Sequence, residues 1–264
     1  MARERERPVS DVPELWHIPL SHFNEKARWT LDYKRVLHRR RVLGPNYLYK
    51  AWRATGQGKL PILFLDGKAI CDSTRIIGAL EERFPDPALY PRDPEARAKA
   101  LALEDFFDEG LGPAVRAAVV TPLFRNDPDI ALRVLTTGMP EQAYKSIRPL
   151  IRIFPSFYRM RHKISEAQLE ADRRTVVEGL DRIERERAGR AYLVGDSFSV
   201  ADLTAAALLN PATQPVQIQY PLQVELPDYI QAWRADLLKH PAAQWALGIY
   251  AKHRGTSAEI PRSA

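Results

Sequence analysis

Residues 59–73 read KLPILFLDGKAICDS and carry the clearest structural signal in the sequence. Two short apolar runs flank Asp66-Gly67, a pair that tolerates the positive φ angles of a tight hairpin turn. Pro61 stands where the first run begins, a place where a strand tolerates a missing N–H. The stretch therefore predicts a β-hairpin that is followed at once by Asp72-Ser73, two residue types that commonly cap helices.

A second strand-to-helix turn lies upstream. The apolar residues 15–18 precede a segment, 22–34, in which apolar residues recur every four positions and so form one helical face. Ser21 then lies at the N-cap of this helix. A serine cap stabilises a helix by roughly 1 kcal/mol, and from position alone that structural role is the preferred interpretation.

The predicted order is strand, helix, strand, short helix, hairpin and helix. In this order, and in the runs PLSHFNEKAR (19–28), KLPIL (59–63) and DGKAICDS (66–73), the chain resembles the thioredoxin-like domain of the cytosolic glutathione transferase family. The run FPDPALYP (84–91) is similar to the linker of that family. The resemblance implies an α/β thioredoxin-like N-terminal domain followed by an all-α C-terminal domain.

The domain boundaries follow from the resemblance and from composition. We expect a disordered tail at 1–12, a glutathione-binding domain at 13–90, a helical domain at 91–254 and a loose tail at 255–264. Within the helical domain, Ser199 and Asp202 have the spacing of a capping box, in which the two residues satisfy each other's backbone at a helix start. We interpret both as structural, not catalytic.

The resemblance also implies a binding site for glutathione. The backbone of Leu60, held before Pro61, would pair with the cysteinyl part of the tripeptide, a general mode of peptide capture at a sheet edge. Lys50, Gln57 and Lys59 would contact the glycine end. Asp72 would meet the amino group of glutathione, and Ser73 its γ-glutamyl carboxylate at a helix N-terminus.

Ser21 matches the position of the family's catalytic serine or cysteine. A free thiol with a pKa near 8.5 is only about 3% ionised at pH 7, and the thiolate is the nucleophile. A hydroxyl that donates to sulfur favours the anion, and lowering the thiol pKa by about two units needs roughly 2.7 kcal/mol. His22 and Asn24 are close to Ser21 and remain alternatives for the group nearest the sulfur.

The site for the second substrate is less legible, because an apolar pocket encodes only shape. Core packing is the commoner role for any one apolar helical residue, but five are candidates to line an electrophile site: Phe107, Leu111, Val115, Phe154 and Phe157. Residues 121–163 are longer than the connection between the early helices of the family's second domain, and we expect them to form a lid.

Residues 145–163 interleave basic with apolar side chains, so binding to an anionic membrane or to nucleic acid is an alternative. Two prolines disfavour it, because they interrupt a continuous amphipathic helix.

Composition narrows the class of protein further. One cysteine in 264 residues, Cys71, excludes an intramolecular disulfide and suits a reducing compartment, so we expect a cytoplasmic protein. Without clustered His and Cys a structural metal site is not expected. No apolar run approaches the roughly 20 residues of a membrane span, and no nucleic-acid-binding motif is present.

These features predict an enzyme, a glutathione transferase that activates the glutathione thiol for attack on a small hydrophobic electrophile by conjugation, ether cleavage or dehalogenation. Glutathione would be its cosubstrate, with no metal, and the resemblance implies a homodimer. The alternative is a protein with the same fold that binds or interacts without turnover, because fold does not fix function.

Overall fold

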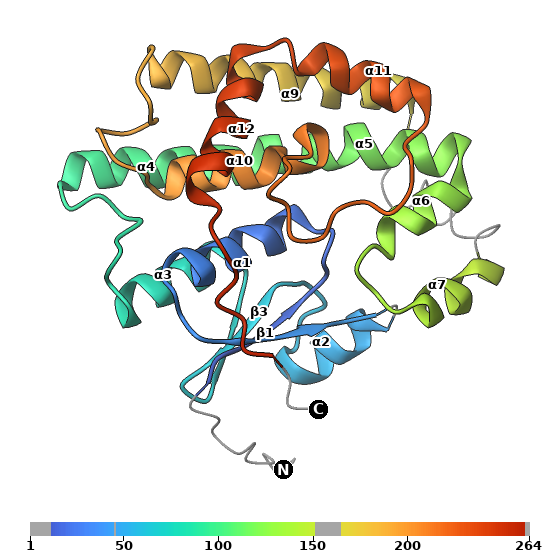
Figure 1. The fold of residues 1–264 in the computed structure, drawn as a ribbon, viewed down its shortest axis with the longest axis horizontal. Helices are drawn as coiled ribbons and strands as arrows, with labels where there is room; N and C mark the ends of the chain where they lie inside the picture. Colours follow the sequence, from blue (N-terminus) through green and yellow to red (C-terminus); the bar gives the residue numbers. More distant parts are fainter. Residues whose placement is uncertain (1–11, 45, 151–164, 262–264) are drawn as a thin grey trace.

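The computed structural model describes residues 12–44, 46–150 and 165–261 of the chain. Its N-terminal part is a small α/β unit (Figure 1). The elements of this unit are, in chain order, β1 (Glu14–His17), α1 (His22–Tyr33), β2 (Arg39–Val42), α2 (Tyr47–Thr55), β3 (Ile62–Leu65), β4 (Lys68–Cys71) and α3 (Ser73–Arg83).

The four strands form one mixed sheet in the order β2-β1-β3-β4. β1 runs parallel to β2 and antiparallel to β3, and β3 and β4 form the predicted hairpin. Because side chains alternate across a strand, Leu15 and Leu63 pack with α1 and α3 on one face, while Trp16 and Ile62 pack with α2 on the other. This is the thioredoxin-like layer arrangement that the sequence predicted.

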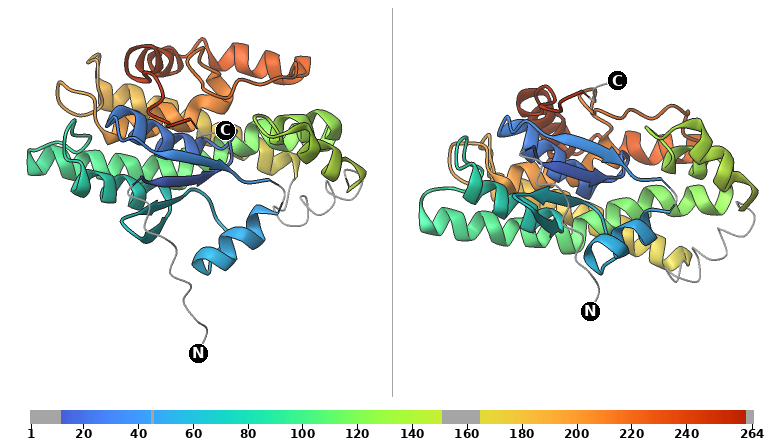
Figure 2. Two further views of the ribbon diagram at one scale, coloured as in Figure 1. Left: turned by 60° about the horizontal axis from the view of Figure 1, so that its bottom comes forward. Right: turned by 90° about the horizontal axis from the view of Figure 1, so that it is seen from below.

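The remainder of the described chain is helical, as predicted. The helices are α4 (Pro94–Phe106), a π-helical turn (Phe107–Leu111), α5 (Gly112–Asn126), α6 (Pro128–Leu135), α7 (Glu141–Ile147), a 3₁₀ turn (Arg148–Leu150), α9 (Glu166–Arg187), α10 (Val200–Thr213), α11 (Asp228–Leu237) and α12 (Pro241–His253). The sheet and α1 lie in front of the long helices α4 and α5 when the molecule is viewed from below (Figure 2). None of the described helices is long and apolar enough to cross a membrane.

Helix α1 belongs to both cores. One of its faces packs on the sheet, whereas Trp29 is fully buried in the core of the helical domain. The Trp29 Nε1–H donates to the carbonyl of His253 at 3.0 Å, and its ring lies 4.4 Å from that of Tyr250. The two domains therefore share a buried helix, which fixes the sheet relative to α10 and α12.

The capping box at the start of α10 is formed as the sequence predicted. Ser199 is the N-cap, and the buried Asp202 carboxylate accepts from the Ser199 N–H at 2.9 Å and the Ser199 hydroxyl at 2.8 Å. It also accepts from the N–H of Leu193 at 2.8 Å. One carboxylate thus joins the loop before α10 to the first turn of the most buried helix.

We expect Asp202→Ala to lower the free energy of unfolding by about 2 kcal/mol, because the N–H groups of Leu193 and Ser199 lose their buried acceptor. Urea denaturation measures this. Asp196→Ala is the matched control, since Asp196 is exposed six residues upstream and its loss should cost at most about 0.5 kcal/mol. Equal losses in both variants would contradict a role for the capping box.

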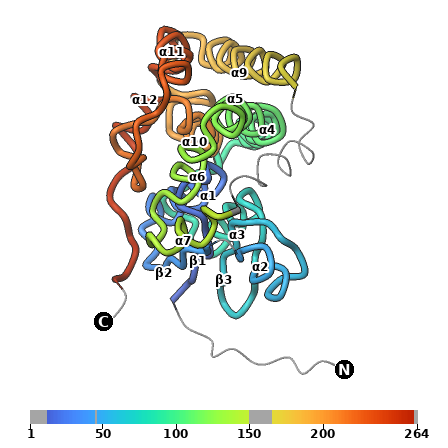
Figure 3. The backbone as a smooth tube through the Cα atoms, turned by 90° about the vertical axis from the view of Figure 1, so that its right-hand side faces the viewer, coloured from blue at the N-terminus to red at the C-terminus, as the bar shows by residue number. Residues whose placement is uncertain are grey.

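Residues 255–261 differ from the loose tail that the sequence predicted. The segment descends from α12 along the side of the molecule to β2 (Figure 3), where Glu259 forms a parallel bridge with His38. The N–H of Ala258 donates to the Asp32 carboxylate at 2.9 Å, and the N–H of Ile260 to the carbonyl of His38 at 2.8 Å. The segment has few apolar residues, but a buried carboxylate and the edge of the sheet supply the acceptors that order it.

Candidate active site

Three turns meet at one end of the sheet. The register pairs the first residue of β3, Ile62, with the last paired residue of β1 and with the last residue of β4. Beyond that register, β1 continues into the turn that bears Ser21, β3 is preceded by Leu60-Pro61, and β4 is followed by Asp72-Ser73. The sheet therefore brings together the three points that the sequence analysis singled out.

Ser21 is the N-cap of α1, and its side-chain oxygen is an acceptor. Asn24 donates to Ser21 Oγ from Nδ2 at 2.7 Å and, more weakly, from its backbone N–H at 3.4 Å. The orientation of the Asn24 amide is fixed, because its Oδ1 accepts the N–H of Ile18 at 3.0 Å. Since Ser21 Oγ accepts these bonds, its own hydroxyl hydrogen remains available to donate to a ligand.

His22 is directed away from this turn and toward the helical domain. Its Nε2 lies 3.0 Å from the carbonyl of Gly112 in α5, an acceptor that requires the hydrogen on Nε2. Burial, with the nearby charge of Arg116, lowers the pKa of His22 to about 3. The imidazole is thus neutral and connects the domains, which weakens it as an alternative to Ser21.

The segment before β3 offers main-chain groups. The Leu60-Pro61 peptide bond is cis. Lys59 is exposed, and the side chain of Gln57 bonds both its N–H (2.8 Å) and its carbonyl (3.0 Å). Gln57 therefore closes a small ring that holds this segment at the end of the sheet.

Asp72 and Ser73 form the N-terminus of α3. Asp72 adopts a φ of 81° and caps the helix, with its Oδ1 accepting from the N–H of Thr74 at 3.0 Å and of Arg75 at 3.4 Å. The Asp72 carbonyl accepts the N–H of Ile76. Among the described residues the Ser73 N–H has no hydrogen-bond acceptor, which leaves it free for an anion at the positive end of the helix dipole.

A buried charge cluster lies behind this helix terminus, and the sequence analysis missed it. Lys26 of α1 is fully buried and donates to Glu104 at 3.0 Å and Asp108 at 2.6 Å; Thr74 donates to the same two carboxylates. Burial raises the pKa of Glu104, and Lys26 opposes that rise. Glu104 and Asp108 are four positions apart and so lie on one helical face, and this spacing was the available signal.

Three of the predicted electrophile residues are buried in the protein core. Phe107, Leu111 and Val115 are at most 1% exposed and belong to the core of the helical domain. The prediction that they line a pocket is wrong, because α10 covers the face on which they lie. Phe154 and Phe157 lie outside the described residues.

The loop between α6 and α7 contacts the turn that bears Ser21. A Cβ at Gly138 would lie 2.8 Å from Cβ of Pro19 and 2.8 Å from Cδ1 of Tyr220, so the glycine allows this close approach. Gly138 also has a φ of 71°, which disfavours other residues. The α6–α7 loop therefore packs against the side chain of Pro19, two residues before Ser21.

Two open cavities lie elsewhere. One, of about 800 Å³, is bounded by residues 32–35, 86–87 and 253–258, and the other, of about 780 Å³, by the hairpin, α3 and the linker. Neither includes a predicted site residue. No group of three or more His, Cys, Asp or Glu side chains is placed to hold a metal ion within the described ranges.

Family models of known proteins match both parts of the chain. The N-terminal domain of glutathione S-transferases matches residues 15–88, and the C-terminal domain of the same family matches residues 147–241. A probable maleylacetoacetate isomerase of Drosophila melanogaster is 26% identical over 188 residues, which are 70% of this chain and 61% of that protein. The chain thus matches less than two thirds of the length of this relative.

Solved structures share the fold across nearly the whole chain. A glutathione S-transferase from Methylobacterium radiotolerans, in complex with glutathione sulfonate, has a TM-score of 0.62 at 21% identity and covers 96% of this chain and 97% of its own. The beta-etherase LigF from Sphingobium sp. strain SYK-6 has a TM-score of 0.58 at 20% identity, with 90% and 99% covered. With both domain models matched in order over more than half of the residues, the chain belongs to the glutathione S-transferase family.

Proposed function

We propose that the protein is a glutathione transferase in which Ser21 favours the thiolate of bound glutathione. The observation that supports this most is the meeting of the Ser21 turn, Leu60-Pro61 and Asp72-Ser73 at one end of the sheet. A peptide paired with Leu60 would extend along that end from the N-terminus of α3 toward Ser21. Its sulfur then lies next to a hydroxyl group.

The hydrogen bonds around Ser21 suit this role. Because Asn24 Nδ2 donates to Ser21 Oγ, the hydroxyl hydrogen is free to donate to sulfur, and the donated bond makes the hydroxyl a stronger donor. Asn24 therefore acts through Ser21 in this proposal. The positive end of the α1 dipole adds to the stabilisation of the anion.

The second substrate is a small hydrophobic electrophile, and the thiolate attacks it by conjugation, ether cleavage or dehalogenation. The name of LigF, a beta-etherase of the same fold, favours ether cleavage among these. The α6–α7 loop, which packs on Pro19, is a nearer wall for this substrate than the buried Phe107. We also propose that the protein forms a homodimer and is located in a reducing compartment, the cytoplasm.

Calorimetric titration with reduced glutathione tests the proposal, with two buffers of different ionisation enthalpy to count released protons. Saturable binding with proton release near pH 7 would support ionisation of the thiol. A turnover assay with a chlorinated dinitrobenzene as the electrophile is then the next measurement. No binding at millimolar glutathione overturns the proposal and favours the alternative, a binding protein without turnover.

We expect Ser73→Ala to weaken glutathione binding by about tenfold, because a hydrogen bond to a charged group contributes roughly 1.5 kcal/mol or more. Turnover at saturating glutathione should change less than twofold, since Ser73 would contact the carboxylate, far from the sulfur. The same calorimetric titration measures the dissociation constant. An unchanged affinity would count against the carboxylate site at the start of α3.

A further inference from the structure

Arg28 of α1 holds the main chain that leads to Ser21. Its Nη2 donates to the carbonyl of Pro19 at 2.9 Å, and its Nη1 to the carbonyl of Ile18 at 3.2 Å. The N–H of Ser21 donates to the same Ile18 carbonyl at 3.2 Å. Because Arg28 is 1% exposed, no water replaces these bonds easily, and a shift of the guanidinium displaces the carbonyl to which Ser21 is bonded.

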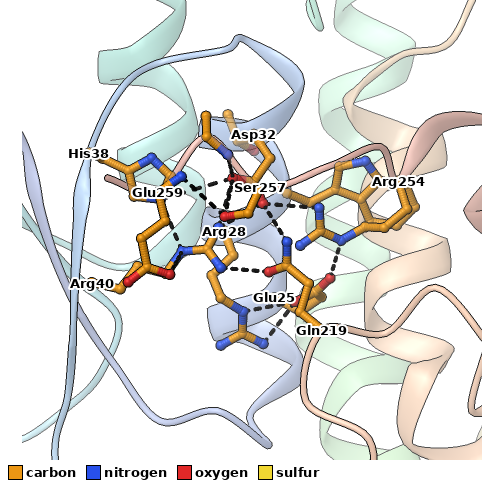
Figure 4. A network of polar contacts seen from close by, with 12 residues as sticks. Glu25, Arg28, Asp32, His38, Arg40, Gln219, Arg254, Ser257 and Glu259 are labelled. Atoms are coloured by element: carbon orange, nitrogen blue, oxygen red, sulfur yellow. Dashed lines mark hydrogen bonds and ion pairs between the residues drawn. The ribbon is translucent and has the colours of Figure 1, made fainter. Parts of the chain in front are cut away.

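Glu25, one turn earlier on α1, orients Arg28. The two oxygens of this buried carboxylate are divided between two guanidinium groups: Arg28 Nε donates to Oε2 at 2.8 Å and Arg254 Nε to Oε1 at 2.5 Å. Burial by itself raises the pKa of Glu25, but Arg254 and Arg28 outweigh it and hold the pKa below its ordinary value. Glu25 is therefore an ionised bridge between the two arginines (Figure 4).

Arg254 comes from the opposite end of the chain. It follows α12 directly, and its side chain is fully buried, with Nη1 bonded to Asp32 at 3.0 Å and the guanidinium 5.6 Å from the ring of Trp29. Asp32 and Glu25 lie two turns apart on α1, so Arg254 spans both. Its position relative to α1 is thus fixed by two carboxylates.

We propose that Arg254 is a positioning residue for the Ser21 turn and acts through Glu25 and Arg28. In a low-dielectric interior each carboxylate and each guanidinium depends on its partner, so the loss of Arg254 leaves Glu25 free to draw Arg28 away from the turn. The chain after α12 thereby sets the direction of the Ser21 hydroxyl. This inference rests on the proposed contact between Ser21 and the glutathione sulfur.

The first test compares Arg254→Met with the parent protein, using glutathione and a chlorinated dinitrobenzene, in which the thiolate displaces chloride. We expect kcat to fall about tenfold, because a misplacement of about 1 Å can cost about 100-fold and Arg254 acts on Ser21 only through two intervening residues. The KM for glutathione should stay within about twofold, and the apparent pKa of the bound thiol, read from thiolate absorbance against pH, should rise. Asp202→Ala is the control, because it costs stability away from the turn and should leave that pKa unchanged.

The second test asks whether Arg254 acts through Arg28. If it does, the double variant Arg28→Met/Arg254→Met has the kcat of Arg28→Met alone. Losses that multiply in the double variant would overturn the inference. If Arg254→Met does not fold, Arg254→Lys replaces it, because lysine keeps the charge but cannot donate to Glu25 and Asp32 with the geometry of a guanidinium.

The inference and the proposed function fail separately. A parent protein that does not bind glutathione overturns the proposed function. The coupling is then read by hydrogen exchange of the peptide that contains residues 18–21, whose amides should exchange faster in Arg254→Met than in Asp202→Ala. Equal exchange of that peptide in the two variants overturns the positioning role, whatever the ligand.

Discussion

Replacing Ser21 with alanine is expected to lower turnover by tens of fold while glutathione affinity stays within a few fold. The hydroxyl acts on the sulfur and not on the two ends of the tripeptide, which explains the separation of the two effects. If the site lowers the thiol pKa from about 8.5 by two units, the ionised fraction of bound glutathione at pH 7 rises from about 3% to about 75%. Loss of the whole pKa shift would therefore lower turnover roughly 25-fold. Steady-state kinetics at saturating glutathione measure this.

The control must reproduce the loss of a helix cap. Ser165 is the N-cap of α9 and accepts the N–H of Gln168 at 3.1 Å, so Ser165→Ala removes a comparable cap far from the site. Each substitution should cost about 1 kcal/mol of stability, but only Ser21→Ala should raise the pKa of the bound thiol. Equal turnover in Ser21→Ala and the parent would move the role to Asn24, whose Nδ2 points at the same place.

The local motifs were legible from sequence because each is a backbone device. The DG turn, the serine cap and the capping box depend on residues within a few positions of one another. The pairing of β3 with β1 then brings Leu60-Pro61 to the Ser21 end of the sheet. Periodicity also predicted that Phe107 lies on an apolar helical face. It did not say that α10, rather than a substrate, covers that face.

The interactions that the sequence analysis missed join distant parts of the chain. Lys26 pairs with carboxylates about eighty positions away, and Asp32 accepts the N–H of Ala258 from the far end of the sequence. Residues 255–264 were predicted to be loose from their glycine, serine and proline content. Composition does not show which acceptors elsewhere in the fold bind the N–H groups of this segment. A single sequence specifies such pairs only through the assembled fold.

Asp32→Asn is expected to destabilise the protein by about 3–5 kcal/mol, the range for breaking one partner of a buried ion pair. Its carboxylate is fully buried, and both of its oxygens accept from the single Nη2 of Arg40, at 2.7 and 2.6 Å. It also accepts bonds from Arg254, Gln219 and Ala258. The amide that replaces it carries no charge, so Arg40 and Arg254 each lose one of their two carboxylate partners. Denaturant unfolding of both proteins at pH 7 measures the difference.

The pH dependence separates this charge effect from a loss of packing. Burial by itself raises the pKa of Asp32, but Arg40 and Arg254 outweigh it and hold the pKa below the ordinary 3.8. A depressed carboxyl pKa contributes stability that is complete above the unfolded-state value and is lost as pH falls through the folded-state value. The difference in free energy of unfolding between the parent and Asp32→Asn should therefore narrow only below about pH 4.

Asp66→Asn is the matched control for the charge effect. Asp66 is 61% exposed beside Arg83, and its loss should cost at most about 1 kcal/mol. The destabilisation by Asp32→Asn could instead be independent of pH, or no larger than that by Asp66→Asn. Either result would mean that the buried charges around Asp32 do not hold the C-terminal segment to the sheet.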